Sequence, residues 1–251
     1  MERSSSNAQG MPGTATTPAP EKASVWEDFL DIFYAPSAVF ARRENGNFWI
    51  PMLVVTVILG VLVLVNSRVM DPIIAAESQR AMAKAMADNP QLTPEMAAQM
   101  SGVTSVITKV STFIGIPIVI FLVGVMLYFV GKIFGAKQTF HAALVVAAYA
   151  YVPKIIEGVL GGLQGFFVDP AQLDGRYRLT LGLGRFLDPD TASPVLIGLL
   201  GRVDIFTIWV TVLLAIGLSV TGRIPRAKAA MAAAVMWLVG ALPGVIGGLF
   251  A

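Results

Sequence analysis

Five long runs of apolar residues dominate the chain, and stretches that contain charged residues, proline and glycine separate them. A helix needs about 20 apolar residues to cross roughly 30 Å of hydrocarbon, and the runs are long enough for this. The pattern therefore predicts an all-α integral membrane bundle of five transmembrane helices. The predicted spans lie at about 48–66, 110–134, 142–168, 203–221 and 228–250, within a membrane domain that covers 48–251.

The composition agrees with this class of fold. Hydrophobic residues make up 55% of the 251 residues and charged residues only 14%, whereas soluble domains carry about 25% charged residues. The net charge of +2 gives no electrostatic case for binding nucleic acid. The chain has no cysteine and a single histidine, His141, which excludes disulfides and thiolate metal sites and leaves little room for histidine chemistry. We expect no cofactor and no metal.

Lysine and arginine in the short connections predict the orientation of the spans, because these residues are enriched on the cytoplasmic side. In a five-span arrangement the charges of the short connections fall on one side, and the loops on the other side are longer and balanced in charge. The N-terminus is therefore expected in the cytoplasm and the C-terminus outside. The residues on the positive side are Arg42, Arg43, Lys132, Lys137, Arg223, Arg226 and Lys228, opposed locally by Glu44.

The chain before the first span divides into two parts. Residues 1–24 are rich in Ser, Thr, Ala and Pro and are predicted to be a disordered cytoplasmic tail rather than a signal peptide. Residues 25–47 are predicted to form an amphipathic helix and a linker, with Ser24 and Glu27 as a capping box. The apolar stripe of the helix consists of Trp26, Phe29, Leu30 and Phe33, and its other face carries Glu27, Asp28 and Asp31.

This acidic face decides where the helix is expected to lie. An anionic cytoplasmic leaflet would repel it, and interfacial helices usually carry a basic polar face. We therefore favour docking against the other helices of the protein, and lying on the lipid surface is the alternative.

The predicted external loop at 67–108 is expected to be helical. It is predicted to break at Asn89-Pro90 and to restart at Thr93, with Pro94 at the first helical position. The loop forms either a cap over the bundle, which we favour slightly, or a docking surface for another subunit.

The predicted external loop at 169–202 has two parts. Residues 169–190 are rich in Gly and Asp, and Asp188-Pro-Asp190 is typical of a turn rather than of a metal site. Ser193-Pro194 is predicted to start a short helix that leads into the fourth span.

Ionisable residues inside the predicted spans are the main candidates for a site. Pro153, Lys154 and Glu157 interrupt the third run, and charged groups at such depth are costly and are often functional. Lys154 and Glu157 lie three residues apart, so they either form a mutual ion pair, reach water at a helix break, or belong to a polar spot on a proton or solute route. Asp204 either caps the fourth span, which we favour, or pairs with Arg202 or Lys154. We expect Trp209 to be a packing residue.

Small residues recur at four-residue spacing in two predicted spans. Such spacing lets helix backbones approach closely. We favour packing within one chain over oligomerisation, which is the alternative. The residues are Gly158, Gly161, Gly162 and Gly165 in the third run and Gly240, Gly244 and Gly248 in the fifth.

Several segments together resemble the Yip family, the Ypt-interacting membrane proteins and their bacterial relatives. The resemblance covers roughly residues 25–250 and implies a five-span helical bundle with a cytoplasmic N-terminus. Eukaryotic members are associated with Rab-type GTPases and vesicle traffic, and the Ala-rich, Cys-free sequence looks bacterial, which implies the cytoplasmic (inner) membrane. The matching pieces are Phe29-Leu-Asp-Ile-Phe-Tyr-Ala-Pro-Ser-Ala-Val-Phe40, Ala148-Tyr-Ala-Tyr-Val-Pro153, Asp204-Ile-Phe-Thr-Ile-Trp209, Leu214-Ala-Ile-Gly217 and Arg226-Ala-Lys-Ala-Ala230.

Three classes of function follow. The leading hypothesis is a non-enzymatic scaffold, adaptor or accessory subunit that contacts membrane lipids and other membrane protein subunits. The alternative is a small permease or lipid-handling protein that uses the polar break at Pro153, Lys154 and Glu157. An enzyme is the weakest hypothesis, because the sequence contains no GxSxG, HExxH or P-loop motif.

Overall fold

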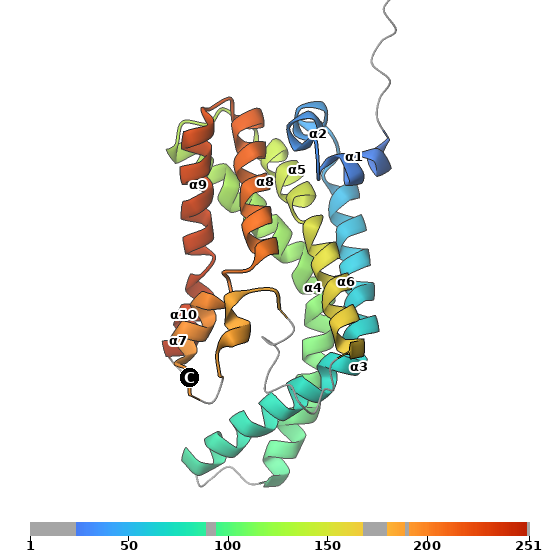
Figure 1. Cartoon of the computed structure of the whole chain (residues 1–251), viewed down its shortest axis with the longest axis vertical. Coiled ribbons are helices and arrows are strands. Elements are labelled where there is room, and N and C mark those ends of the chain that lie inside the picture. Colours follow the sequence, from blue (N-terminus) through green and yellow to red (C-terminus); the bar gives the residue numbers. More distant parts are fainter. Residues whose placement is uncertain (1–23, 89–93, 168–179, 189–190, 250–251) are drawn as a thin grey trace, which may run out of the picture.

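The computed structural model describes residues 24–88, 94–167, 180–188 and 191–249, and this part of the chain folds into helices (Figure 1). The predicted all-α class is confirmed. The predicted tail, apart from Ser24, lies outside the described residues. The elements are α1 (Val25–Asp31), α2 (Pro36–Arg43), α3 (Trp49–Asp88), α4 (Pro94–Ile133), α5 (Phe140–Ala150), α6 (Pro153–Phe167), the 3-10 helix η3 (Leu183–Phe186), α7 (Pro194–Leu200), α8 (Ile205–Gly222), α9 (Arg226–Val239) and α10 (Leu242–Leu249).

Within the described residues, five helical segments are long and apolar enough to cross a membrane, as predicted. The third is interrupted between α5 and α6, where Tyr151 and Val152 form a turn, so it is not one continuous helix. The fifth is interrupted between α9 and α10. The five segments are Trp49–Arg80, Phe113–Ile133, Phe140–Gln164, Ile205–Gly222 and Arg226–Ile246.

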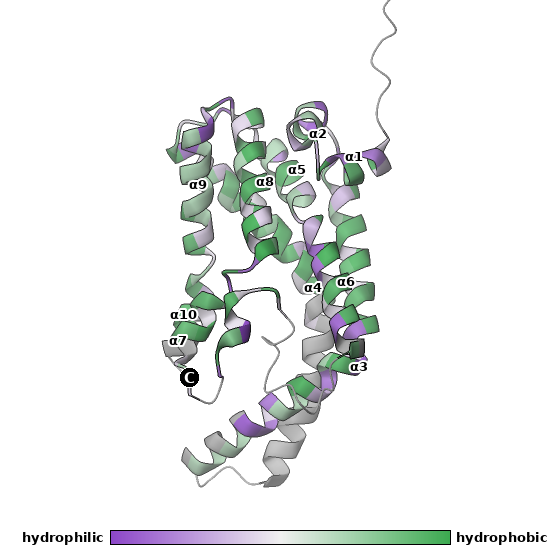
Figure 2. Cartoon of the chain, in the orientation of Figure 1, coloured by the Kyte–Doolittle hydropathy of each residue, from purple (hydrophilic) through white to green (hydrophobic). Residues whose placement is uncertain are grey.

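Hydrophobic residues predominate along these segments (Figure 2), and many of their side chains are exposed. On α3, Leu53, Val57 and Val61 are each more than half exposed, and Ile114 and Leu122 of α4 are similarly exposed. An apolar surface of this kind in water would be an association or aggregation site. In a bilayer it is the surface that faces lipid.

Helix α5 forms the centre of the bundle, and every residue from Ala142 to Ala150 is buried. Its neighbours α4 and α8 approach it closely at glycines. A Cβ atom on Gly124 of α4 would lie 2.6 Å from Leu144, and one on Gly217 of α8 would lie 2.3 Å from Val146. Small residues therefore allow the close helix contacts that hold the bundle together.

The glycines of the third and fifth spans make contacts within the chain. Gly158 and Gly162 of α6 lie against Leu62 and Asn66 of α3, and the Asn66 side-chain amide donates to the Gly158 carbonyl at 2.9 Å. Gly161 faces open space. Gly240 lies against Arg202, and Gly244 of α10 packs on Gly198 of α7, whereas the surroundings of Gly165 and Gly248 fall outside the described part.

Helices α3 and α4 continue past the end of the bundle as a helical arm (Figure 1). Each has 40 residues, which at 1.5 Å per residue is about 60 Å, roughly twice the hydrocarbon thickness. The predicted helical halves of the first loop are thus continuous with the spans. Helix α4 starts at Pro94 as predicted, while Asn89-Pro90 and Thr93 lie outside the described residues.

The arm projects beyond the bundle in a direction that differs from the spans (Figure 1). Helix α3 contains Pro72, and a proline inside a helix removes one backbone hydrogen bond and bends the helix. The predicted loop helices are therefore extensions of the span helices themselves, and their role as a cap or as a docking surface stays a prediction. Helix α1 and the C-terminal helix α10 lie at opposite ends of the bundle.

Candidate functional site

The chain enters the bundle through the short helix α1, whose start matches the prediction. The Ser24 hydroxyl accepts the Glu27 amide at 3.2 Å, and the Glu27 carboxylate accepts the Ser24 amide at 2.6 Å. The predicted capping box is therefore confirmed. These two bonds satisfy backbone donors that the first helical turn leaves free.

Asp28, which was predicted on the acidic face opposite the apolar stripe, is completely buried. The Arg42 and Arg43 side chains of α2 donate to its two carboxylate oxygens through Nε, at 2.6 Å and 2.5 Å. The Tyr149 hydroxyl of α5 also donates to it at 3.1 Å. We refer to these four side chains as the Asp28 network. The carboxylate is stable in this buried position because it has three charged or hydroxyl donors.

Arg42 joins a second carboxylate to this network. Its guanidinium also forms an ion pair with Asp31, and that hydrogen bond holds the pKa of Asp31 below its ordinary value. A hydrogen bond to Asp31 in turn raises the pKa of the Tyr34 hydroxyl. Asp28 and Asp31 thus pair with Arg42 and Arg43, and Glu44 pairs with Arg223 of the same positive set at 3.3 Å.

The predicted apolar stripe of α1 is divided between two environments. The ring of Phe29 lies 5.8 Å from that of Tyr149, and the ring of Phe33 lies edge-on to Trp209 at 5.3 Å. Trp26 and Leu30 are 68% and 63% exposed. Helix α1 thus docks on the bundle, as favoured, through its phenylalanines, and leaves part of the stripe uncovered.

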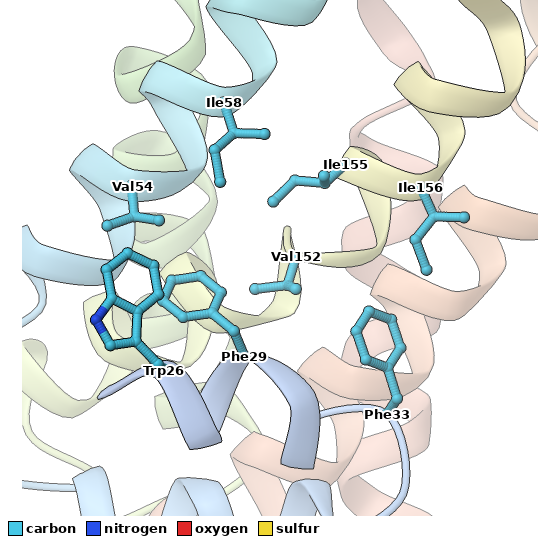
Figure 3. Close-up of a pocket in the computed structure, with 8 residues that line it drawn as sticks. All are labelled: Trp26, Phe29, Phe33, Val54, Ile58, Val152, Ile155 and Ile156. Carbon is cyan, nitrogen blue, oxygen red and sulfur yellow. The ribbon is translucent and has the colours of Figure 1, made fainter. Parts of the chain in front are cut away.

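An apolar groove lies next to α1, between α3 and the junction of α5 and α6 (Figure 3). Its volume is about 200 Å³. The side chains of α1 form one end of it and those of α3 and α6 form its walls. The lining residues are Trp26, Phe29, Phe33, Val54, Ile58, Val152, Ile155 and Ile156.

The ionisable residues predicted in the spans meet in a second polar group, the Lys154 cluster, which consists of Lys154, Glu157, Asp204 and Thr207. The Lys154 ammonium lies 2.6 Å from Glu157 Oε2, 3.8 Å from Asp204 Oδ1 and 3.1 Å from the Thr207 hydroxyl. Lys154 and Glu157 thus form the mutual ion pair, and they follow a helix break. The contact with Thr207 has no signal in the sequence.

Asp204 has two roles in the Lys154 cluster. Its Oδ1 accepts the backbone amides of Phe206 and Thr207 at 2.9 Å each, so it caps α8 as predicted. The same carboxylate accepts the Thr207 hydroxyl and faces Lys154. Trp209 packs as expected, between Phe33 and Phe206.

The Lys154 cluster lies deep in the bundle. Lys154 comes about 14 residues after the start of α5, which corresponds to about 21 Å along a helix. Two carboxylates surround one ammonium, and the side chains of Lys154 and Glu157 are about a quarter exposed. The cluster is thus a self-paired polar group that directly follows the break in the third segment.

A third buried polar contact was not predicted. The Gln138 amide donates to the Leu127 carbonyl at 3.0 Å and accepts the Thr221 hydroxyl at 2.9 Å. The neighbouring Lys137 backbone amide donates to the Gly222 carbonyl at 2.9 Å. These bonds tie the α4–α5 connection to the end of α8. Glutamine and threonine are common near helix ends, so the sequence alone does not mark them.

The segments that resembled a known family converge in space. Phe29 of α1 lies against Tyr149 at the end of α5, and Phe33, which follows α1, lies edge-on to Trp209 near the start of α8. A family model, the Yip1 domain, matches residues 30–247. No curated protein and no solved structure matches the chain. The match covers most of the sequence and all five apolar helical segments, so this multi-pass membrane protein belongs to the Yip1 domain family.

Proposed function

We propose that the protein is a non-enzymatic scaffold, adaptor or accessory subunit of a membrane assembly. In this proposal its N-terminus lies in the cytoplasm, its C-terminus lies outside, and it resides in the cytoplasmic (inner) membrane. The observation that carries the proposal is the Asp28 network. The polar groups of this network pair with one another, and they fix the position of a helix rather than present a reactive group.

The network makes α1 and α2 a rigid part of the bundle. Asp28 is buried and bridges two arginines of α2 and a tyrosine of the third span. An adaptor needs a surface whose shape does not change between free and bound states, because ordering a mobile surface costs free energy on binding. Leu30 and Tyr34 are exposed on this fixed helix and the turn that follows it.

The arm formed by α3 and α4 supports the same proposal at the other end of the bundle. It extends past the spans and adds surface that a membrane bundle does not need for its own packing (Figure 1). Residues such as Arg80 are exposed on it. A partner subunit that docks at the arm would contact helices continuous with the first two spans.

The test is extraction of the protein from its own membrane in native lipid particles, followed by quantification of the proteins that remain with it. We expect a partner protein to co-purify with the native protein at a defined stoichiometry. We expect the Asp28→Ala variant, in which α1 is no longer held in place, to lose this partner. The matched control is Glu44→Gln, which removes only an exposed ion pair with Arg223. If the native protein runs alone in such particles, the proposal is wrong.

A second candidate function is a small permease, and the Lys154 cluster favours it. Broken helices with polar groups often mark transporter sites, and here a helix break lies beside Lys154, Glu157 and Asp204. The expected result in liposomes is solute transport that disappears in Lys154→Met, Glu157→Gln double variants. Transport that is unchanged in the double variant would exclude this function for the cluster.

A further inference from the structure

The groove next to α1 lies at the depth of lipid acyl chains. Helix α3 begins at Trp49, and Val54 and Ile58 follow about 5 and 9 residues later, or about 8 and 14 Å along the helix. Half of the hydrocarbon layer is about 15 Å thick. The walls of the groove therefore face one leaflet of the bilayer, and α1 lies at its surface.

The lining of the groove is apolar and one side of it is open. Its residues are aliphatic or aromatic, with the Trp26 indole at the end next to α1 (Figure 3). Trp26 and Ile156 are exposed, so they form the open side. Apolar cavities of this kind do not hold ordered water, because water needs polar partners.

The size of the groove restricts what can fill it. Typical small-molecule pockets measure about 300–1,000 Å³. A linear, flexible hydrocarbon chain can lie along a small groove that is open on one side, and its methylene groups match the aliphatic and aromatic lining.

We propose that this groove binds one acyl chain of a membrane phospholipid. The chain lies between Val54 and Ile58 of α3 on one side and Ile155 and Ile156 of α6 on the other. Phe29 and Phe33 close the end next to α1. The lipid is thus a structural ligand of α1, distinct from the lipids that only surround the spans.

The position of the two phenylalanines connects the lipid to the packing of α1. Phe29 touches both the groove and Tyr149 of the Asp28 network, and Phe33 touches both the groove and Trp209 of α8. A chain seated in the groove fills the space beside these rings. Loss of the lipid is expected to loosen α1 without changing the spans.

The first experiment is native mass spectrometry of the purified protein after exchange into detergent, with phospholipid added back. We expect one phospholipid to stay bound in preference to detergent. Val54→Trp fills the groove and is expected to reduce retention at least about tenfold, which is about 1.4 kcal/mol. Val57→Trp is the matched control, because Val57 lies on the same helix and is 59% exposed.

The second experiment uses a phospholipid with a photoreactive group in its acyl chain, reconstituted with the protein. Crosslinks are expected to concentrate on peptides that contain Val54 and Ile58 or Val152 and Ile156. Ile156→Trp blocks the opposite wall and provides a second variant if Val54→Trp does not fold. Its expected effect is the same loss of crosslinking.

Two outcomes overturn the proposal. The first is equal lipid retention in wild type, Val54→Trp and Ile156→Trp. The second is crosslinking at the exposed Val57 and Val61 face as strong as in the groove.

Discussion

Asp28 and Tyr149 are 121 positions apart in the sequence, yet the Tyr149 hydroxyl donates to the Asp28 carboxylate at 3.1 Å inside the bundle. The bond joins a helix that precedes the first span to the centre of the third. Both side chains are almost completely buried. The contact therefore fixes how the segment before the membrane sits on the membrane domain.

Asp28→Asn is expected to destabilise the protein by about 3 kcal/mol, because it leaves Arg42 and Arg43 without their buried anion. Thermal unfolding in detergent measures this effect. The control is Glu44→Gln, whose exposed pair with Arg223 contributes about 0–1 kcal/mol. Equal unfolding temperatures for the two variants would contradict the structural role of Asp28.

Lowering the pH is expected to weaken the docking of α1 through Asp31. The hydrogen bond from Arg42 keeps the pKa of Asp31 below its ordinary value of 3.8. The pair therefore stabilises the folded state above that value, and the contribution is lost as the pH falls through the lowered pKa. Unfolding curves between about pH 2 and 5 are expected to depend less steeply on pH in Asp31→Asn than in wild type. Identical slopes would show that this pair does not contribute.

Two glycine substitutions are expected to have opposite effects. Gly217→Ala places a methyl group against Val146, where the Cβ would lie 2.3 Å from Cγ1, and is expected to cost about 1–3 kcal/mol. Gly161→Ala adds a methyl group in open space on α6, and it is expected to stabilise the helix by about 0.4–1 kcal/mol. Unfolding temperatures of the two variants check the sign of each effect.

The Lys154 cluster is expected to behave as one unit in a double-mutant cycle. Lys154→Met leaves Glu157 and Asp204 without their cation, and Glu157→Gln leaves Lys154 with Asp204 alone. We expect the double variant to be more stable than the sum of the single changes indicates, with a coupling energy of about 0.5–3 kcal/mol. Additive changes in unfolding free energy would mean that the 2.6 Å pair does not form in the bilayer.

The proposed orientation is testable because the chain has no cysteine. Asn45 lies between α2 and α3 and is exposed, and Ala87 is exposed on the arm beyond Arg80. A membrane-impermeant thiol reagent applied to intact cells is expected to label the Ala87→Cys variant but not the Asn45→Cys variant. The reverse pattern would invert the proposed topology.

The membrane spans could be predicted from the sequence because their signal is local. Apolar residues accumulate over about 20 positions, and this is enough to identify a span. The capping roles of Ser24 and Asp204 were also predictable, because each cap bonds to amides two or three residues away. The Lys154 and Glu157 pair follows from helical spacing in the same way.

The buried position of Asp28 could not be predicted, because its partners lie on two other elements. Local periodicity placed Asp28 with Glu27 and Asp31 on a polar face, and only the fold brings Arg43 and Tyr149 to it. The close contacts that Gly124 of α4 and Gly217 of α8 make with α5 could not be predicted for the same reason. Gly217 has no second glycine four positions away, so no GxxxG pattern marks it. Its contact with Val146 depends on how the spans are arranged.

The separation between Asp28 and Tyr149 also sets an order of assembly. Chains are synthesised at about 5–20 residues per second, so Tyr149 follows Asp28 by about 6–24 s. For much of this interval α1 exists without its buried hydroxyl partner. Helix α1 therefore reaches its final position only after the third span has entered the membrane. The bond between Asp28 and Tyr149 can form only when insertion of the bundle has progressed to its central helix.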